Sequence, residues 1–208
     1  MQSYSFNPDL LRAKYKQERD KRLREDGNEQ YQEVSGDFSY FVDDPYINEE
    51  IERKALTDSY EIVIIGGGFG GVLAASRLKE AGFSDFKIIE KGGNFGGTWY
   101  WNRYPGASCD IESYIYFPLL EETKFIPGKK YTNAPETLEY FDVISEKFGL
   151  NEHAIFQTEV DNVRWNDDER LWELNTNKGD KIKCNYVVHA NGPLNRPKLP
   201  AINGINDY

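Results

Sequence analysis

The clearest hydrophobic pattern lies in the first half of the chain, where two short apolar runs flank a glycine-rich turn. Residues 62–65 (IVII) form a continuous apolar run, typical of a strand buried on both faces of a parallel sheet. After a G-x-G-x-x-G motif, apolar residues recur at helical spacing over 69–81, and residues 86–89 form a second apolar run. The pattern predicts a strand, a helix and a second strand parallel to the first.

Each glycine of the turn has a physical role in binding a dinucleotide. Gly66 permits a tight turn, Gly68 lets the main chain approach a pyrophosphate, and Gly71 lets the helix pack against the strand. The helix N-terminus offers N–H groups and the positive end of its dipole to a phosphate. Glu90 ends the second strand, where it can accept hydrogen bonds from a ribose diol and disfavours a 2′-phosphate. The unit predicts FAD or NAD; a purely structural turn is the alternative.

The remaining elements are less regular. Residues 8–25 are predicted to form a highly charged helix, and residues 28–57 an irregular, aromatic arm that wraps the domain and ends in a short helical piece at 47–55. A second amphipathic helix is predicted over 132–149. Short strands separated by turns are predicted after it, at 155–160, 163–166, 171–176 and 181–188. These strands predict a β-meander added to the parallel sheet.

A second informative stretch follows Glu90, and we call residues 91–118 the aromatic loop. Its glycines and prolines argue against regular structure, yet it holds too many tryptophans and tyrosines for a solvated loop, so we expect it to line a site. Gly96 and Gly97 would let its main chain approach a ligand, and Thr98 could donate a hydroxyl. Asp110 is the only acid between 97 and 111. It is either a structural turn residue or a carboxylate that faces a cofactor.

Composition narrows the class of protein. The 208 residues carry a net charge of −10, which argues against nucleic acid or an anionic membrane as a partner. The chain lacks the run of about 18 apolar residues that a membrane span needs. Its N-terminus is too charged for a signal peptide, which predicts a cytoplasmic protein. Two cysteines without metal or redox spacing, and two histidines, predict no metal site.

The aromatic loop carries a family resemblance. Its segment GGTWYWNRYPGASCDIESYIY is similar to a loop of the type I Baeyer–Villiger monooxygenases, class B flavoprotein monooxygenases within the flavin-containing monooxygenase superfamily. Residues 60–200 resemble the N-terminal FAD-binding portion of that family. The N-terminal LRAKYKQERDKRLREDGNEQY resembles that of a longer branch, whose members favour bulky or polycyclic ketones. The resemblance implies an enzyme that uses FAD, NADPH and molecular oxygen to convert ketones into esters or lactones.

The resemblance also implies site residues, position by position. The FAD pyrophosphate would be surrounded by Gly66, Gly68, Phe69, Gly70 and Gly71, and the adenosine ribose would meet Glu90. The flavin would lie beside Thr98, Trp99, Tyr100 and Trp101. The other cofactor-binding positions are Lys91, Gly97, Tyr116 and Val160, the last through its backbone at the adenine. Ser108, Cys109 and Asp110 match the segment at the nicotinamide end of NADP, and Asp110 matches the acid that supports a catalytic arginine.

The expected fold class is α/β, a Rossmann-like FAD-binding domain with a central parallel sheet and an added β-meander. The expected division is an N-terminal helical extension and wrapping arm at 1–57, the first segment of the FAD-binding domain at 58–194, and the start of a linker at 195–208. The sequence holds no second G-x-G-x-x-G and no arginine that matches the catalytic one. We therefore expect a truncated, incomplete two-dinucleotide-binding architecture that is not catalytically complete alone.

Two alternatives remain beside the ketone monooxygenase. One is another class of flavin oxidoreductase, such as a disulfide reductase, although the C-x-x-x-x-C that a reductase would carry after the first helix is absent. The other is a non-catalytic remnant that binds nucleotide or serves as an interaction module. The sequence predicts neither the particular ketone nor the oligomeric state.

Overall fold

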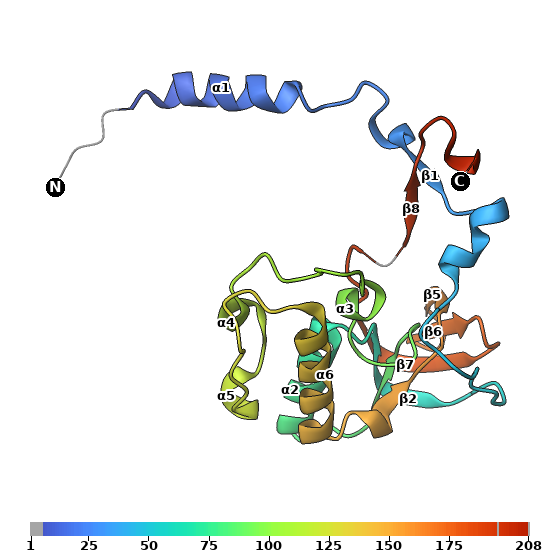
Figure 1. Ribbon diagram of the computed structural model, residues 1–208. Coiled ribbons are helices and arrows are strands. Elements are labelled where there is room, and N and C mark those ends of the chain that lie inside the picture. Colours follow the sequence, from blue (N-terminus) through green and yellow to red (C-terminus); the bar gives the residue numbers. More distant parts are fainter. Residues whose placement is uncertain (1–5, 195, 208) are drawn as a thin grey trace. The chain divides into compact units, whose positions relative to one another are not determined.

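The computed structural model describes residues 6–194 and 196–207, which belong to two compact units. The larger unit is Asp44–Asn195, and the smaller unit combines Met1–Asp43 with Arg196–Tyr208 (Figure 1). Residues 44–57, which the sequence analysis grouped with the N-terminal extension, thus lie in the larger unit.

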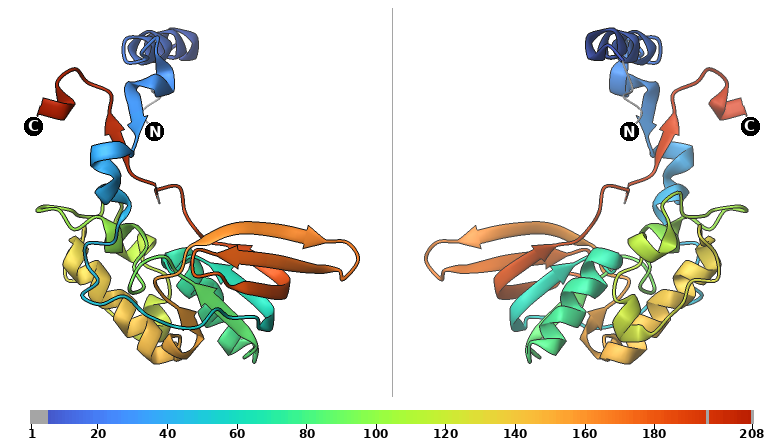
Figure 2. Two further views of the ribbon diagram at one scale, coloured as in Figure 1. Left: turned by 90° about the vertical axis from the view of Figure 1, so that its right-hand side faces the viewer. Right: turned by 90° about the vertical axis from the view of Figure 1, so that its left-hand side faces the viewer.

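A six-stranded sheet forms the centre of the larger unit, in the order β4-β3-β2-β7-β6-β5. Its strands are β2 (Ser59–Ile65), β3 (Phe86–Ile89), β4 (Ala154–Ile155), β5 (Val160–Asn166), β6 (Leu171–Thr176) and β7 (Lys181–His189). The first four in spatial order are parallel, and β7, β6 and β5 are antiparallel neighbours. Figure 2 shows the β5–β6 hairpin, in orange, continuing the sheet. The predicted parallel sheet with an added meander is confirmed.

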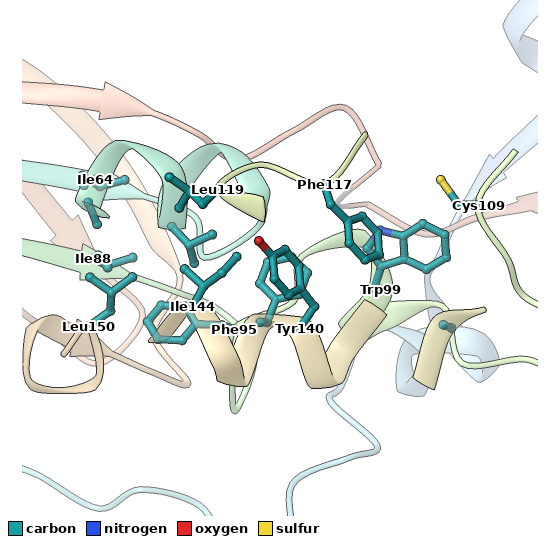
Figure 3. Close-up of a cluster of buried hydrophobic side chains, with 14 of the residues drawn as sticks. Ile64, Ile88, Phe95, Trp99, Cys109, Phe117, Leu119, Tyr140, Ile144 and Leu150 are labelled. Carbon is teal, nitrogen blue, oxygen red and sulfur yellow. The ribbon is translucent and has the colours of Figure 1, made fainter. Parts of the chain in front are cut away.

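Alternation along β2 explains its continuous apolar sequence. Ile62 and Ile64 belong to a buried cluster with α2 (Phe69–Glu80) and α6 (Ala134–Phe148), part of which Figure 3 shows. Val63 lies in a second cluster that includes Leu174 and Ile182 of the meander. Because successive side chains of a strand point to opposite faces, both faces of β2 need apolar residues.

Both termini of the helix α6 carry residues that favour helix ends. Asn133 accepts a hydrogen bond from the Glu136 N–H at the N-terminus, and Pro135 occupies the first turn. Gly149 terminates the helix in the left-handed conformation, with φ of 62°. The remaining element of this region is the short 3-10 helix η3 (Asn151–His153).

The arm segment, residues 44–57, is held on the larger unit by side chains far along the chain. The Arg53 guanidinium donates to both oxygens of Asp180, at 2.6 and 2.7 Å, and Asp180 also accepts from the Leu56 N–H at 2.8 Å. Gln157 accepts from the Ile51 N–H at 2.8 Å. The predicted helical piece at 47–55 is wrong, since these hydrogen bonds are made by an irregular backbone.

Two further predictions of local structure differ from the structure. The predicted strand at 155–160 is divided, because Gln157 has φ of 52° and interrupts the extended backbone between β4 and β5. The aromatic loop contains regular structure, in the one-turn helices α3 (Thr98–Trp101) and α4 (Ser113–Tyr116). A third one-turn helix, α5 (Leu120–Thr123), follows it.

The smaller unit joins segments from the two ends of the chain. Its elements are α1 (Pro8–Asp20), η1 (Gly27–Gln30), β1 (Tyr31–Glu33), η2 (Gly36–Val42), β8 (Lys198–Pro200) and η4 (Ile205–Asp207). The strands β1 and β8 pair antiparallel, with Gln32 opposite Leu199. The helix α1 begins at Pro8, as predicted, with Asn7 as its N-cap, but it ends at Asp20 rather than residue 25. Among the described residues, none of the helices combines the length and apolar character that crossing a membrane requires.

Candidate cofactor-binding site

The G-x-G-x-x-G motif forms a tight corner, which we call the glycine corner (residues 66–71). Gly66 has φ of 106°, and a Cβ there would lie 2.6 Å from the carbonyl oxygen of Ala190. A Cβ at Gly71 would lie 1.9 Å from the carbonyl oxygen of Gly66. Side chains at either position would collide with main chain, so glycine is required for α2 to turn back against β2.

The N-terminus of α2 is open. Its N-cap residue, Gly68, supplies no side-chain hydrogen bond. The first N–H groups of any α-helix have no partner within the helix, and the helix dipole makes this end positive. The geometry fits an anion such as a phosphate.

The aromatic loop reaches this helix end through two glycines. A Cβ at Gly97 would lie 2.7 Å from Cα of Gly68, and the Gly96 N–H donates to the Gly67 carbonyl at 3.0 Å. Gly97 also has φ of 51°, which favours glycine. The structure therefore brings Gly68 and Gly97, two predicted cofactor-binding positions from different motifs, into contact.

Glu90 lies beneath the glycine corner with 5% of its surface exposed. Its carboxylate accepts from the Gly67 N–H at 2.5 Å and from the Gly92 N–H at 2.7 Å. Burial raises the pKa of the Glu90 carboxyl, although the two N–H donors oppose this effect. Each carboxylate oxygen has a second lone pair, so these bonds do not exhaust its capacity to accept. A ribose contact of Glu90 stays a prediction.

Three predicted FAD contacts form one aromatic group. The Trp99 indole N–H donates to the Tyr116 hydroxyl at 3.1 Å, and the Phe69 ring lies edge-on to Tyr116 with centroids 5.2 Å apart. Phe69 also stacks on Phe141 of α6 at 4.3 Å. Trp99 and Phe117 both belong to the main buried cluster (Figure 3). The group connects the aromatic loop with the start of α2, since Phe69 is the first residue of that helix.

Lys91 and Val160 lie in neighbouring segments. Lys91 Nζ is 3.1 Å from a carboxylate oxygen of Glu159, and the Thr158 N–H donates to the Glu90 carbonyl at 3.0 Å. The backbone before β5 therefore runs beside the end of β3. This arrangement agrees with a shared adenosine site, which stays a prediction for both residues.

The segment 108–110 is tied to the start of α6. The Cys109 N–H donates to the Thr132 carbonyl at 2.8 Å, and Ser108 forms an isolated bridge with Asn133. Cys109 is buried, whereas Ser108 and Asp110 are exposed. The Asp110 carboxylate is thus accessible, and its contacts with NADP or a catalytic arginine stay predictions.

Comparisons with known proteins identify the family. The pyridine nucleotide-disulphide oxidoreductase family matches residues 63–208. The chain belongs to this family. Its relatives include the Baeyer-Villiger monooxygenase ATR8 of Stachybotrys chlorohalonatus, 43% identical, with 98% of this chain and 33% of the relative covered. Neopentalenolactone D synthase of Streptomyces avermitilis is also 43% identical, with 96% and 34% covered.

Comparison with solved structures supports the similarity to monooxygenases. The polycyclic ketone monooxygenase from Thermothelomyces thermophila has a TM-score of 0.82 and 37% identity, with 95% of this chain and 34% of that chain covered. The complex of OTEMO with FAD and NADP has a TM-score of 0.66 and 33% identity, with 72% and 28% covered. The resemblance to Baeyer–Villiger monooxygenases is confirmed. The chain spans about a third of the length of these relatives.

The two structural matches cover different shares of this chain. A match over 72% of the chain needs no residue before 58, whereas a match over 95% includes most of residues 1–57. The polycyclic ketone monooxygenase therefore shares much of the N-terminal extension, as the sequence resemblance to the longer branch implied.

Sequence reasoning missed a set of residues that supports the aromatic loop of this family member. Asp44, Tyr46 and Arg103 contact Tyr100, which is buried and turns its hydroxyl toward Asp44. Burial raises the pKa of the Tyr100 hydroxyl, and its hydrogen bond to Asp44 adds to the shift. No periodicity or short motif links residues 56 positions apart, so the sequence pattern held no signal for this contact.

Proposed function

We propose that this chain binds FAD between the glycine corner and the aromatic loop, as the FAD-binding part of an NADPH- and oxygen-dependent ketone monooxygenase. The observation that carries the proposal is the contact between Gly68 and Gly97, which joins an open helix N-terminus to a tryptophan-rich loop. A phosphate-binding end and a surface for a planar ring thereby adjoin one another. FAD presents these two chemical groups in one molecule.

The glycine corner would hold the pyrophosphate. The N–H groups at Phe69, Gly70 and Gly71 belong to the first turn of α2, where the helix dipole favours negative charge. Glu90 would accept hydrogen bonds from the adenosine ribose, with Lys91 and the backbone of Val160 beside it. Two buried N–H donors fix the Glu90 carboxylate before ligand binds, which reduces the ordering cost of binding.

The aromatic loop would cover the flavin end. Thr98, Trp99, Tyr100 and Trp101 form α3, and the Trp99–Tyr116 hydrogen bond fixes the indole. Their packed rings would exclude water from the reacting centre. The chemistry that bound FAD supplies is oxygen activation, with NADPH as reductant, and the products would be esters or lactones.

Ser108, Cys109 and Asp110 would meet the nicotinamide end of NADP. The backbone bonds to Thr132 and Asn133 hold this segment, while the exposed Asp110 carboxylate can attract a cation. We assign Asp110 the catalytic role of pairing with the arginine that the resemblance implies. No arginine of these 208 residues matches that position.

The substrate class that we propose is a bulky ketone. Its support is the N-terminal extension, most of which lies within the 95% of this chain that matches the polycyclic ketone monooxygenase. The negative net charge and the cysteine content support a cytoplasmic location without nucleic acid as a partner. A disulfide reductase is disfavoured, because the sequence lacks the C-x-x-x-x-C motif and both of its cysteines are buried.

Flavin binding by the 208-residue chain tests the proposal. The purified chain is expected to quench FAD fluorescence in a saturable titration, and Gly68→Asp is expected to weaken this binding at least about a hundredfold. The substitution places a carboxylate against Gly97 and the phosphate site, where charge repulsion and bulk act together.

The matched control is Ser84→Asp, which adds the same charge at an exposed position in the turn before β3. Its FAD affinity should equal that of the wild-type chain. Unaltered FAD binding by Gly68→Asp would contradict the assignment of the glycine corner, and no binding by the wild-type chain would favour the non-catalytic remnant.

A further inference from the structure

Asp44 joins the arm segment directly to the aromatic loop. One of its oxygens, Oδ2, accepts hydrogen bonds from the Tyr100 hydroxyl at 2.7 Å and the Gly93 N–H at 3.1 Å. The Gly93 N–H also lies 3.0 Å from the Tyr100 hydroxyl oxygen, so the three groups form a closed triangle. The other oxygen, Oδ1, accepts from the Tyr46 N–H at 2.9 Å. Oδ2 therefore joins the arm segment to the aromatic loop, and Oδ1 holds the backbone of the arm segment itself.

Arg103, which follows the C-terminus of α3, packs against Tyr46 of the same arm segment. Its guanidinium carbon lies 3.9 Å from the centroid of the Tyr46 ring and 4.5 Å from that of Tyr100. Its Nε donates to the Tyr100 carbonyl at 2.9 Å. The Tyr46 ring meets Tyr100 edge-on, with centroids 5.7 Å apart. Tyr100 is thus fixed at its hydroxyl, its ring and its carbonyl.

Tyr100 in turn packs against the main chain that forms the candidate site. A Cβ at Gly92 would lie 2.9 Å from the Tyr100 ring, and a Cβ at Gly96 would lie 2.9 Å from the Cβ of Tyr100. The Gly92 N–H donates to the Glu90 carboxylate, and Gly97, the residue after Gly96, contacts Gly68. A displacement of the Tyr100 side chain would therefore reach both the proposed ribose site and the proposed flavin site.

We propose that Asp44 is a positioning residue for the cofactor site: it fixes Tyr100 and thereby holds the main chain at 96–97 against the glycine corner. This inference rests on the proposed function, because it concerns the affinity of that site for FAD. The arm segment would then contribute to cofactor binding, although its sequence contains no cofactor-binding motif. Asp44 acts through Tyr100 and Gly93 rather than by touching the cofactor.

The test compares Asp44→Ala with Asp43→Ala, which removes the same charge from the preceding, exposed residue. In the 208-residue chain, Asp44→Ala is expected to raise the Kd for FAD about tenfold and to speed hydrogen exchange of the amides in residues 93–103. Asp43→Ala should change neither quantity. Asp44→Asn retains a carbonyl oxygen for the Tyr100 hydroxyl and should recover most of the affinity.

Tyr100→Phe removes only the hydroxyl and supplies a second, milder variant. Because both groups act through one hydrogen bond, the double variant should bind FAD no more weakly than the weaker single variant. If the wild-type chain binds FAD and Asp44→Ala binds it with the same Kd, only the positioning role is overturned. Unchanged hydrogen exchange in residues 93–103 of Asp44→Ala would overturn it too. A wild-type chain that binds no FAD would overturn the proposed function itself.

Discussion

Two buried carboxylates, in two regions of the larger unit, are held in opposite ways. Glu90 lies under the glycine corner and accepts from two backbone N–H groups. Asp180 lies under the arm segment, where it is 1% exposed and paired with the Arg53 guanidinium. The ion pair lowers the pKa of Asp180 to about 2, whereas burial raises the pKa of Glu90. Asp180 is thus an acid whose partners stabilise the fold, whereas Glu90 is an acid held by backbone N–H groups at a site suited to a ligand.

The largest expected effect is on the fold, at Asp180. Asp180→Ala leaves the Arg53 guanidinium, whose side chain is 19% exposed, without its carboxylate, and it also removes the acceptor of the Leu56 N–H. Breaking one partner of a buried pair costs about 3–5 kcal/mol of unfolding free energy. Urea denaturation followed by circular dichroism would measure it.

Glu169→Ala is the control for this variant, since Glu169 pairs with Lys183 at an exposed position. It should cost less than about 1 kcal/mol, because solvent screens surface pairs. Equal effects of the two substitutions would contradict the view that Asp180 anchors the arm segment.

The two carboxylates should give stability opposite dependences on pH. Asp180 has a pKa below its ordinary 3.8, so its contribution is present above that value and is lost as pH falls toward about 2. A shift of this size corresponds to roughly 2 kcal/mol. Glu90 has a pKa above its ordinary 4.5, so its contribution is present below that value and is lost as pH rises through the raised pKa.

Denaturation at a series of pH values would separate the two. The difference in unfolding free energy between wild type and Asp180→Asn should grow from pH 2 to about pH 4 and then stay constant. The difference between wild type and Glu90→Gln should fall as pH rises above about 4.5. If both differences changed in the same direction, the contrast between the two regions would be wrong.

The same contrast explains what the sequence could predict. The strand, helix and strand at 62–65, 69–81 and 86–89 correspond to β2, α2 and β3, because turn chemistry and periodicity act between near neighbours. The Arg53–Asp180 pair joins residues 127 positions apart, and no local pattern encodes such a contact. Likewise, the hydroxyl of Tyr100 in α3 donates to Asp44, 56 positions away, and the pairing of β1 with β8 joins segments near the two ends of the chain. The candidate site was therefore predictable at the glycine corner and not in its supports.

The smallest expected effect concerns Glu90 as a ligand for ribose. Glu90→Gln keeps the size of the side chain but replaces one acceptor oxygen with a donor, which would face either a backbone N–H or the ribose hydroxyls. Loss of one charged hydrogen bond predicts about a tenfold rise in the Kd for FAD, or roughly 1.4 kcal/mol. Fluorescence titration at pH 7 would measure it, with Glu90→Asp as a variant that keeps the charge but withdraws it by one methylene. If Glu90→Gln bound FAD as tightly as the wild-type chain, Glu90 would be a structural acid like Asp180. The two regions would then differ only in the ion pair that Asp180 makes with Arg53.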